Sequence, residues 1–203
     1  SGENACILHY TENADELSSG DLVLIDAGCE LEGYAADITR TFPVNGKFSP
    51  VQKVLYQLVL DSQHAALEQL KPGNTISQAM QACVRVIVEG LVELGILSGS
   101  IEKNIEKETW RSYFMHGLGH WLGLDVHDVG IYKIDNADRP LEVGMVMTVE
   151  PGIYIPVSAN VDDKFKGIGI RIEDDIVITV GGNHIMTSKV PKAVSEIEAL
   201  MAS

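Results

Sequence analysis

The sequence predicts a mixed α+β fold, in which two long helices are flanked by the strands of a largely antiparallel sheet. Two segments repeat apolar residues at the helical spacing of three and four, and each follows a capping sequence. Several shorter runs are rich in Val and Ile and have the length of strands. The 203 residues, 45% of them apolar and 22% charged, are enough for one domain with a substantial core.

The first predicted helix begins at Ser49-Pro50-Val51-Gln52. Ser49 is the expected N-cap, Pro50 takes the first helical position, and Gln52 completes a capping box. Lys71-Pro72-Gly73 ends the pattern, because proline and glycine interrupt helices. The expected core-facing stripe consists of Val51, Val54, Leu55, Leu58 and Val59.

The second predicted helix begins at Thr75, with Gln78 three residues later as the capping partner, and ends near Gly95. Met80 and Cys83 belong to its apolar stripe, so we interpret them as packing residues rather than ligands. The full stripe is Ile76, Ala79, Met80, Cys83, Val84, Ile87, Val88 and Leu91.

Five runs are predicted strands: Leu22 to Asp26, Ala35 to Phe42, Val146 to Glu150, Gly152 to Ile155, and Ile168 to Val180. Glycines at 28 and 33 suit a hairpin turn between the first two, which would bring Asp26 and Asp37 onto neighbouring strands. In the last run the two-residue period places Arg171, Glu173 and Asp175 on one face.

Charge and cysteine content exclude several classes of function. With 15 basic and 29 acidic residues the formal charge is -14, which argues against nucleic acid or an anionic membrane surface as a partner. Cys6, Cys29 and Cys83 are widely spaced, which fits neither a disulfide framework nor a structural zinc site and favours a reducing cytoplasm. No run approaches the length of a membrane span.

Five ionisable residues stand in apolar or glycine-rich surroundings, where a charge is out of place. They are Asp26, Asp37, His120, Glu150 and Glu173. Buried carboxylates are costly unless a cation neutralises them. Four carboxylates and one imidazole therefore indicate a centre for two metal ions.

Five segments, in order along the chain, resemble the catalytic domain of aminopeptidase P, within the creatinase, prolidase and methionine aminopeptidase superfamily that shares the pita-bread fold. The resemblance begins with Ser-Gly-Glu-Asn-Ala-Cys-Ile-Leu-His-Tyr at 1 to 10 and extends over nearly the whole chain. The segments are Leu-Ile-Asp-Ala-Gly-Cys at 24 to 29, Asp-Ile-Thr-Arg-Thr-Phe-Pro-Val-Asn-Gly at 37 to 46, Phe-Met-His-Gly-Leu-Gly-His-Trp-Leu-Gly-Leu-Asp-Val-His-Asp at 114 to 128, Thr-Val-Glu-Pro-Gly at 148 to 152, and Gly-Ile-Gly-Ile-Arg-Ile-Glu-Asp-Asp at 167 to 175.

The resemblance implies a curved, largely antiparallel pita-bread sheet covered by helices, and it implies which residues bind metal. Asp37 and Glu173 would bind both of two divalent ions, Asp26 one of them, and His120 and Glu150 the other. Because oxygen ligands dominate, manganese(II) is the expected ion, with cobalt(II) or zinc as substitutes.

Catalytic roles follow from the same resemblance. A metal-activated hydroxide would attack the peptide bond, and Glu150 would pass a proton toward the leaving amine. His127 would contact the reacting peptide, while His9 and His116 would line the pocket around the scissile bond.

Four further residues have weaker support. Arg171 is either a substrate-binding residue or an ion-pair partner of the acidic cluster, and Tyr154 belongs either to the substrate pocket or to the core. His64 and His184 lie outside the matching segments, so we interpret them as surface or structural residues.

Competing hydrolase motifs do not fit. The spacing His116-x-x-x-His120 matches that of the zincins, but zincins require glutamate directly after the first histidine, and this chain has Gly117 there. The two glycines between the histidines also indicate a loop rather than the zincin helix, so a single-zinc metalloprotease is disfavoured. The chain also lacks the G-x-S-x-G elbow of serine hydrolases.

We therefore expect a metallo-aminopeptidase that removes the N-terminal residue from peptides with proline in second position. The alternatives are a prolidase acting on Xaa-Pro dipeptides and a catalytically silent peptide-binding module. Residues 1–203 would form one catalytic domain lacking its first segment and the amino-terminal domain of the family. The resemblance implies that the full-length protein is a homo-oligomer.

Overall fold

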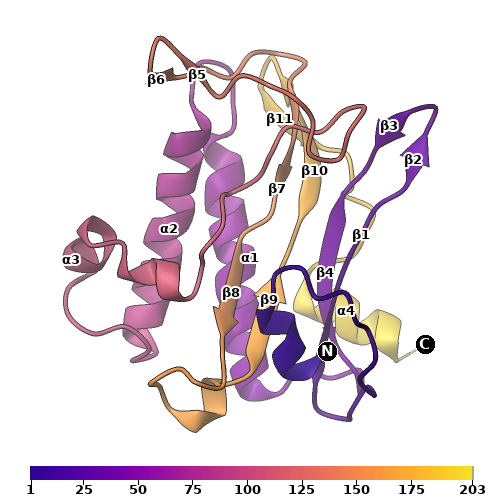
Figure 1. Ribbon diagram of the computed structural model, residues 1–203, viewed down its shortest axis with the longest axis vertical. Helices are drawn as coiled ribbons and strands as arrows, with labels where there is room; N and C mark the ends of the chain where they lie inside the picture. Colours follow the sequence, from indigo (N-terminus) through magenta and orange to yellow (C-terminus); the bar gives the residue numbers. More distant parts are fainter. Residues whose placement is uncertain (203) are drawn as a thin grey trace.

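The computed structural model describes residues 1–202 and has the expected mixture of helices and strands. Two long helices, α1 (Pro50–Gln69) and α2 (Ile76–Glu93), pack against each other beside the strands (Figure 1). The strands β7 to β10 lie between these two helices and the β1–β4 pair, which is on the opposite side of the molecule from α2.

Both long helices begin as predicted. Ser49 and Gln52 form one capping box, and Thr75 and Gln78 form another. The α2 stripe is buried as expected, apart from the partly buried Ile76 and Met80. The α1 stripe is partly wrong, because Val54 is 48% exposed. The buried face of α1 instead includes Tyr56 and the polar Gln63, both fully buried, because it contacts strand backbone as well as α2.

The predicted hairpin is present. β1 (Leu22–Ala27) pairs antiparallel with β4 (Ile38–Pro43), and Asp26 lies opposite Thr39. The tip is a short hairpin of β2 (Glu30–Leu31) and β3 (Tyr34–Ala35). Here the chain passes so close to itself that a Cβ at Gly28 would lie 1.6 Å from the Ala36 carbonyl oxygen. This crossing interrupts the single strand predicted from Ala35 to Phe42, so Asp37 immediately precedes β4.

The predicted strand from Ile168 to Val180 is likewise two strands. β9 (Ile168–Arg171) pairs with β8 (Gly152–Ile155), whereas β10 (Asp174–Thr179) lies between β7 (Val146–Val149) and β11 (Gly182–Ile185). At Glu173, between β9 and β10, the backbone N–H donates to the carbonyl of Thr39 on β4. The chain therefore changes its hydrogen-bonding partner strand at this residue. Every pairing among the described strands is antiparallel, but the strands form several small sheets rather than one.

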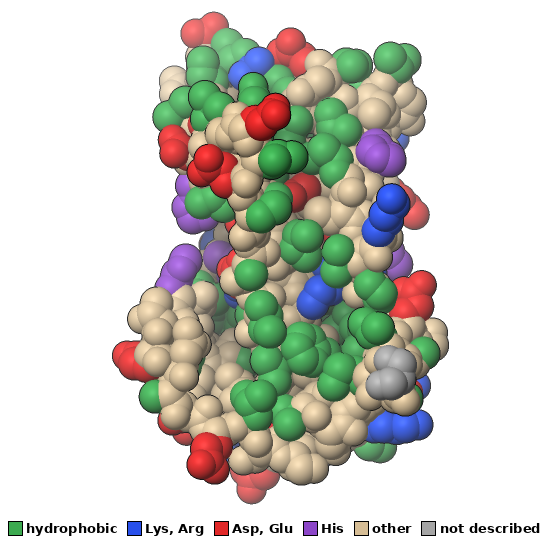
Figure 2. Space-filling view, turned by 90° about the vertical axis from the view of Figure 1, so that its right-hand side faces the viewer, with side chains coloured by type: hydrophobic (Ala, Val, Ile, Leu, Met, Phe, Trp, Pro, Cys, Tyr) green, Lys and Arg blue, Asp and Glu red, His purple; other side chains and the backbone are tan. Residues whose placement is uncertain are grey.

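Shorter elements complete the described chain. They are η1 (Gly2–Cys6), α3 (Ile101–Glu106), η2 (Thr109–Ser112), β5 (Lys133–Ile134), β6 (Ala137–Asp138), η3 (Asp163–Phe165) and α4 (Val194–Met201). None of the helices in residues 1–202 has the length and apolar character that crossing a bilayer requires. The side that carries β1 to β4 shows many apolar side chains at its surface (Figure 2). Ile25 on β1, Leu31 on β2 and Tyr34 on β3 are exposed.

A buried ionic cluster fixes the segment before α4 to β10. Asp174 is fully buried and accepts hydrogen bonds from Arg40 (2.8 Å), Lys192 (2.6 Å) and Thr187 (2.7 Å). Arg40 also donates to the carbonyls of Val190 and Pro191 and, at 2.6 Å, of Glu173. Burial opposes ionisation, but Arg40 and Lys192 hold the pKa of Asp174 below its ordinary value. This cluster orients the backbone directly beside Glu173.

Candidate metal centre

The elements deliver the five predicted ligands to one place from five points along the chain. Asp26 is on β1, Asp37 immediately precedes β4, Glu150 immediately follows β7, and Glu173 joins β9 to β10. His120 comes from an extended loop that runs beside β7, where the Thr148 N–H donates to the His120 carbonyl. A Cβ at Gly119 would lie 2.0 Å from the Thr148 carbonyl oxygen, so glycine permits this close approach.

One cavity of about 410 Å³ contains all five of these side chains. Its remaining lining is Leu8, His9, His116, Gly117, Gly119, His127 and Arg171. Asp37 and Glu173 are buried, whereas the Asp26 side chain is 43% exposed and stands at the mouth. Ligand atoms of Asp37, His120 and Glu173 lie within 4.8 Å of one another, which is compatible with a shared cation.

The orientation of His120 suits a metal ligand. Its Nδ1 lies 3.1 Å from the Trp121 carbonyl oxygen, which accepts only, so Nδ1 carries the hydrogen. Nε2 then faces Asp37 Oδ2 at 3.5 Å and Glu150 Oε1 at 3.6 Å. A lone pair directed at two carboxylates needs a proton or a cation between them. Metal-bound histidines commonly donate their second ring nitrogen to a carbonyl in this way.

Electrostatics also favour a cation at this site. Burial raises the pKa of Glu150 to about 7 and of Glu173 to about 9, with repulsion among the carboxylates adding to the effect. Burial raises the pKa of Asp26, whereas hydrogen bonds with His120 and Asp26 overcome burial and lower that of Asp37. Burial alone would lower the pKa of His120, but its hydrogen bond with Asp37 raises it to about 9. The residues present therefore fit a divalent metal ion. Four carboxylates share this cavity, and His120 and Arg171 do not supply enough positive charge to balance them.

Arg171 links the carboxylates to the wall of the cavity. Its guanidinium donates to Asp26 Oδ2 at 2.7 Å, to Thr39 Oγ1 at 3.1 Å and to Tyr154 Oη at 3.0 Å. Arg171 is thus an ion-pair partner of the acidic cluster, which is one of the two interpretations from the sequence, and it also lines the cavity.

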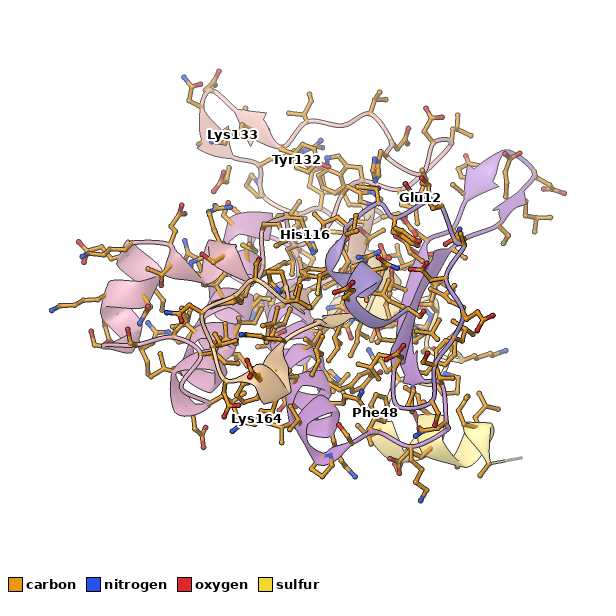
Figure 3. The ribbon with its side chains drawn as sticks, turned by 60° about the horizontal axis from the view of Figure 1, so that its bottom comes forward. Glu12, Phe48, His116, Tyr132, Lys133 and Lys164 are labelled. Atoms are coloured by element: carbon orange, nitrogen blue, oxygen red, sulfur yellow. The ribbon has the colours of Figure 1, made fainter. Side chains whose placement is uncertain are left out.

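His116 is held in one orientation by the same network. Nδ1 faces the Gly117 carbonyl at 2.9 Å, and Nε2 lies 2.8 Å from Tyr154 Oη. Because the carbonyl only accepts, Nδ1 carries the hydrogen and Nε2 accepts from the tyrosine. Burial lowers the pKa of His116 to about 4, so the ring is neutral at neutral pH. In Figure 3 His116 lies near the centre of the molecule.

The other predicted site residues differ in exposure. His9 and His127 are exposed at the cavity, and the His127 ring contacts that of His120 with centroids 4.2 Å apart. Tyr154 is fully buried behind the lining and reaches the site through its hydroxyl, while burial raises its pKa to about 12. His64 is on α1 and His184 on β11, both exposed and outside the cavity lining.

Sequence reasoning assigned no role to three buried polar residues beside the centre, although it placed Asp175 on the same strand face as Glu173. Thr39 donates to Glu173 Oε2 at 2.6 Å, Thr148 accepts from the His120 N–H at 3.1 Å, and Asp175 accepts from the Asp37 N–H at 3.1 Å. Each lies two residues from a predicted ligand, so the two-residue period of a strand was the signal that would have found them.

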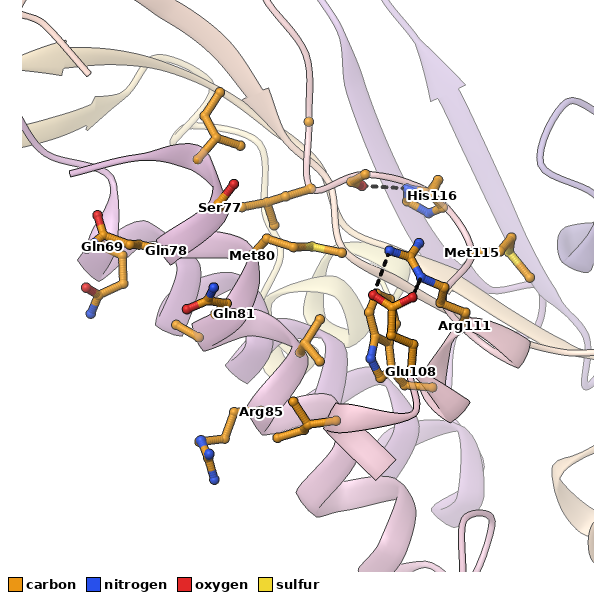
Figure 4. Close-up of a pocket in the computed structure, with 18 of the residues that line it drawn as sticks. Gln69, Ser77, Gln78, Met80, Gln81, Arg85, Glu108, Arg111, Met115 and His116 are labelled. Atoms are coloured by element: carbon orange, nitrogen blue, oxygen red, sulfur yellow. Dashed lines mark hydrogen bonds and ion pairs between the residues drawn. The ribbon is translucent and has the colours of Figure 1, made fainter. Parts of the chain in front are cut away.

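A larger cavity of about 930 Å³ lies on the other side of the His116–Gly119 loop, between α2 and η2 (Figure 4). Gln78, Gln81 and Arg85 of α2 line it, as does the exposed Glu108–Arg111 ion pair. Its lining residues do not form a cluster of carboxylates and histidines, so the metal-binding chemistry belongs to the smaller cavity.

Comparison with known proteins gives a consistent picture. Residues 1–180 match the model of metallopeptidase family M24. The chain is 60% identical over 200 residues to the Xaa-Pro aminopeptidase of Haemophilus influenzae, covering 98% of this chain and 46% of that protein.

Two solved structures show the same fold. The structure of Pseudomonas aeruginosa aminopeptidase PepP superposes with a TM-score of 0.98 at 55% identity, covering 99% of this chain and 46% of that one. A zinc-substituted Escherichia coli aminopeptidase P in complex with product gives 0.96 at 58% identity, with the same two coverages. The chain thus spans about half the length of the relatives it matches.

Proposed function

The chain belongs to metallopeptidase family M24, and from that premise we propose that it removes the N-terminal residue from peptides with proline in second position. The observation that carries the proposal is the cavity of about 410 Å³, which gathers the five predicted ligands and His9, His116 and His127. The relatives named Xaa-Pro aminopeptidase support the choice of substrate.

Two divalent ions are proposed to bind at Asp26, Asp37, His120, Glu150 and Glu173. Asp37 and Glu173 would bind both ions, Asp26 one, and His120 and Glu150 the other. Oxygen-rich coordination with one imidazole favours manganese(II), with cobalt(II) and zinc as substitutes. When bound, such ions supply Lewis acidity that lowers the pKa of a shared water and polarises the scissile carbonyl.

Glu150 is the proposed proton carrier. Its Oε2 lies 3.9 Å from His116 Nδ1 and its Oε1 lies 3.6 Å from His120 Nε2. Glu150 therefore lies between His120, another predicted ligand, and His116 in the cavity lining. A carboxylate in this position takes the proton of the attacking water at one oxygen and returns it to the leaving amine.

The histidines and Arg171 are proposed to hold the peptide. His127, exposed beside His120, would donate a hydrogen bond to the reacting peptide. His9 and His116, which both line the cavity, would have the scissile bond between them. Arg171 is a proposed substrate-binding residue. Tyr154 is predicted for the same role, but it is fully buried behind the cavity lining, so its hydrogen bond of 3.0 Å with Arg171 orients that guanidinium instead.

The test is hydrolysis of an Xaa-Pro-Yaa tripeptide and of an Xaa-Pro dipeptide by metal-free protein, before and after manganese(II) is added, with bound metal counted in parallel. We expect manganese-dependent cleavage of the tripeptide and two ions per chain. Preference for the dipeptide would replace the proposal by a prolidase. Bound metal without cleavage of either peptide would contradict the enzymatic proposal for this chain.

Several finer expectations accompany this function. We propose that the small antiparallel sheets belong to one curved pita-bread arrangement, and that residues 1–203 are one catalytic domain. A homo-oligomer for the full-length protein and a location in the cytoplasm stay predictions from the sequence.

A further inference from the structure

Thr39 makes the shortest described contact between a neutral side chain and a predicted metal ligand. Its hydroxyl lies 2.6 Å from Glu173 Oε2, and Thr39 itself is fully buried. This distance is at the short end of the range for a hydrogen bond from a hydroxyl to an oxygen. Water does not reach Thr39, so solvent cannot replace this hydrogen bond if it is removed.

A second contact orients the hydroxyl. Arg171 Nε donates to Thr39 Oγ1 at 3.1 Å, and arginine is always a donor. The hydroxyl therefore accepts from Arg171 and has its own hydrogen for Glu173. Thr39 is also β-branched, which restricts its side-chain torsion and holds the oxygen in place. The backbone adds a third contact, because the Glu173 N–H donates to the Thr39 carbonyl at 3.1 Å.

We propose that Thr39 is a positioning residue for the metal centre, whose hydroxyl fixes one carboxylate oxygen of Glu173 so that the other is presented to the bound ions. This inference rests on the proposed function, in which Glu173 binds both ions. Thr39 would touch neither metal nor substrate. It acts through Glu173, as groups around metal ligands commonly do.

The same strand provides a matched control. Thr41 is also fully buried, lies two residues further along the same face of β4, and uses its hydroxyl in a similar bridge. Its partners, however, are the carbonyl and N–H of Arg171 at 2.9 and 3.2 Å, not a carboxylate. Thr41→Val therefore removes a buried hydroxyl from β4 without touching a predicted ligand.

The experiment is a titration of the metal-free chain with manganese(II) alone, comparing Thr39→Val, Thr39→Ser, Thr39→Ala and Thr41→Val with the unaltered protein. We expect Thr39→Val to weaken manganese(II) affinity about 10- to 100-fold, the usual effect of removing a hydrogen-bond partner of a metal ligand. Thr41→Val should bind as the unaltered chain does. Far-ultraviolet circular dichroism establishes that each variant is folded.

Thr39→Ser and Thr39→Ala differ by one oxygen, so they test the hydroxyl even if the valine variant does not fold. We expect serine to retain affinity within a few-fold and alanine to lose it. Equal affinities for these two, or equal losses in Thr39→Val and Thr41→Val, would overturn the proposal.

The two proposals fail in different ways. If the unaltered chain binds manganese(II) but cleaves no Xaa-Pro-Yaa tripeptide, the proposed activity is wrong, while the order of affinities among the variants still supports Thr39. If the unaltered chain cleaves the tripeptide and Thr39→Ala matches it in manganese(II) affinity, only the role of Thr39 is wrong.

Discussion

His120 and Asp37 face each other across the centre, with Nε2 of the imidazole 3.5 Å from Oδ2 of the carboxylate. One residue comes from an extended loop and the other from the start of β4. Burial opposes protonation of His120, but the hydrogen bond with Asp37 raises the pKa of the imidazole to about 9.

Replacing Asp37 should empty the centre. Asp37→Ala removes a carboxylate that is proposed to bind both ions. Each ion would lose one ligand, so we expect loss of manganese(II) at both sites. Metal content after dialysis, measured by atomic absorption, checks this. Asp138→Ala on β6, where the side chain is exposed, is the control. Full metal content in Asp37→Ala would sink the ligand assignment.

Replacing His127 should separate metal binding from turnover. His127→Ala removes an exposed ring beside His120 that is proposed to contact the peptide, so metal content should be unchanged while kcat on an Xaa-Pro-Yaa tripeptide falls about 100-fold. His184→Ala, also exposed but on β11, should retain full activity. The assignment would be abandoned if the two variants had the same kcat.

Removing metal should destabilise the fold. An ion present at 100 times its dissociation constant stabilises the folded state by about 2.7 kcal/mol, which corresponds to a Tm higher by about 5 to 10 °C for a domain of this size. Thermal unfolding with a chelator, and then with manganese(II), measures the difference. Asp37→Ala should show no such shift, and a similar shift in that variant would mean that manganese(II) binds elsewhere.

The buried cluster beside Glu173 should contribute strongly to stability. Arg40→Met leaves the fully buried Asp174 with Lys192 but without the guanidinium, at an expected cost of about 3 kcal/mol in the free energy of unfolding. Arg85→Met breaks an exposed pair on α2 and should cost less than about 0.5 kcal/mol. Urea unfolding compares the two, and equal midpoints would show that burial of the cluster has no such effect.

The three unpaired cysteines should differ in reactivity. Cys83 is fully buried, and burial raises its pKa to about 12, so at pH 8 it should not react with a thiol reagent until the protein unfolds. Cys29 is exposed and should react first. Loss of the fast phase in Cys29→Ser would agree with this order, whereas rapid labelling of Cys83 in native protein would contradict the packing of α2.

The local features of the fold could be predicted from the sequence, because capping and periodicity depend on neighbouring residues. The starts of α1 and α2 and the hairpin between Asp26 and Asp37 agree with prediction. The breaks in the two long predicted strands could not be read in this way. They arise where Ala36 crosses Gly28 near the tip of the hairpin and where Glu173 pairs with Thr39 from a distant part of the chain, and both contacts are made with residues outside the strand that is interrupted.

The sequence by itself determined which residue types carry the chemistry, since charged side chains in apolar runs are conspicuous without coordinates. The tertiary structure decided what surrounds them. The hydroxyl of Thr39 on Glu173, the placement of Tyr154 behind His116, and the ionic cluster of Arg40 and Asp174 join residues far apart in the chain. Hydrogen bonds of 2.6 to 3.0 Å depend on the approach of separate strands, and neither propensity nor spacing along one strand specifies that approach.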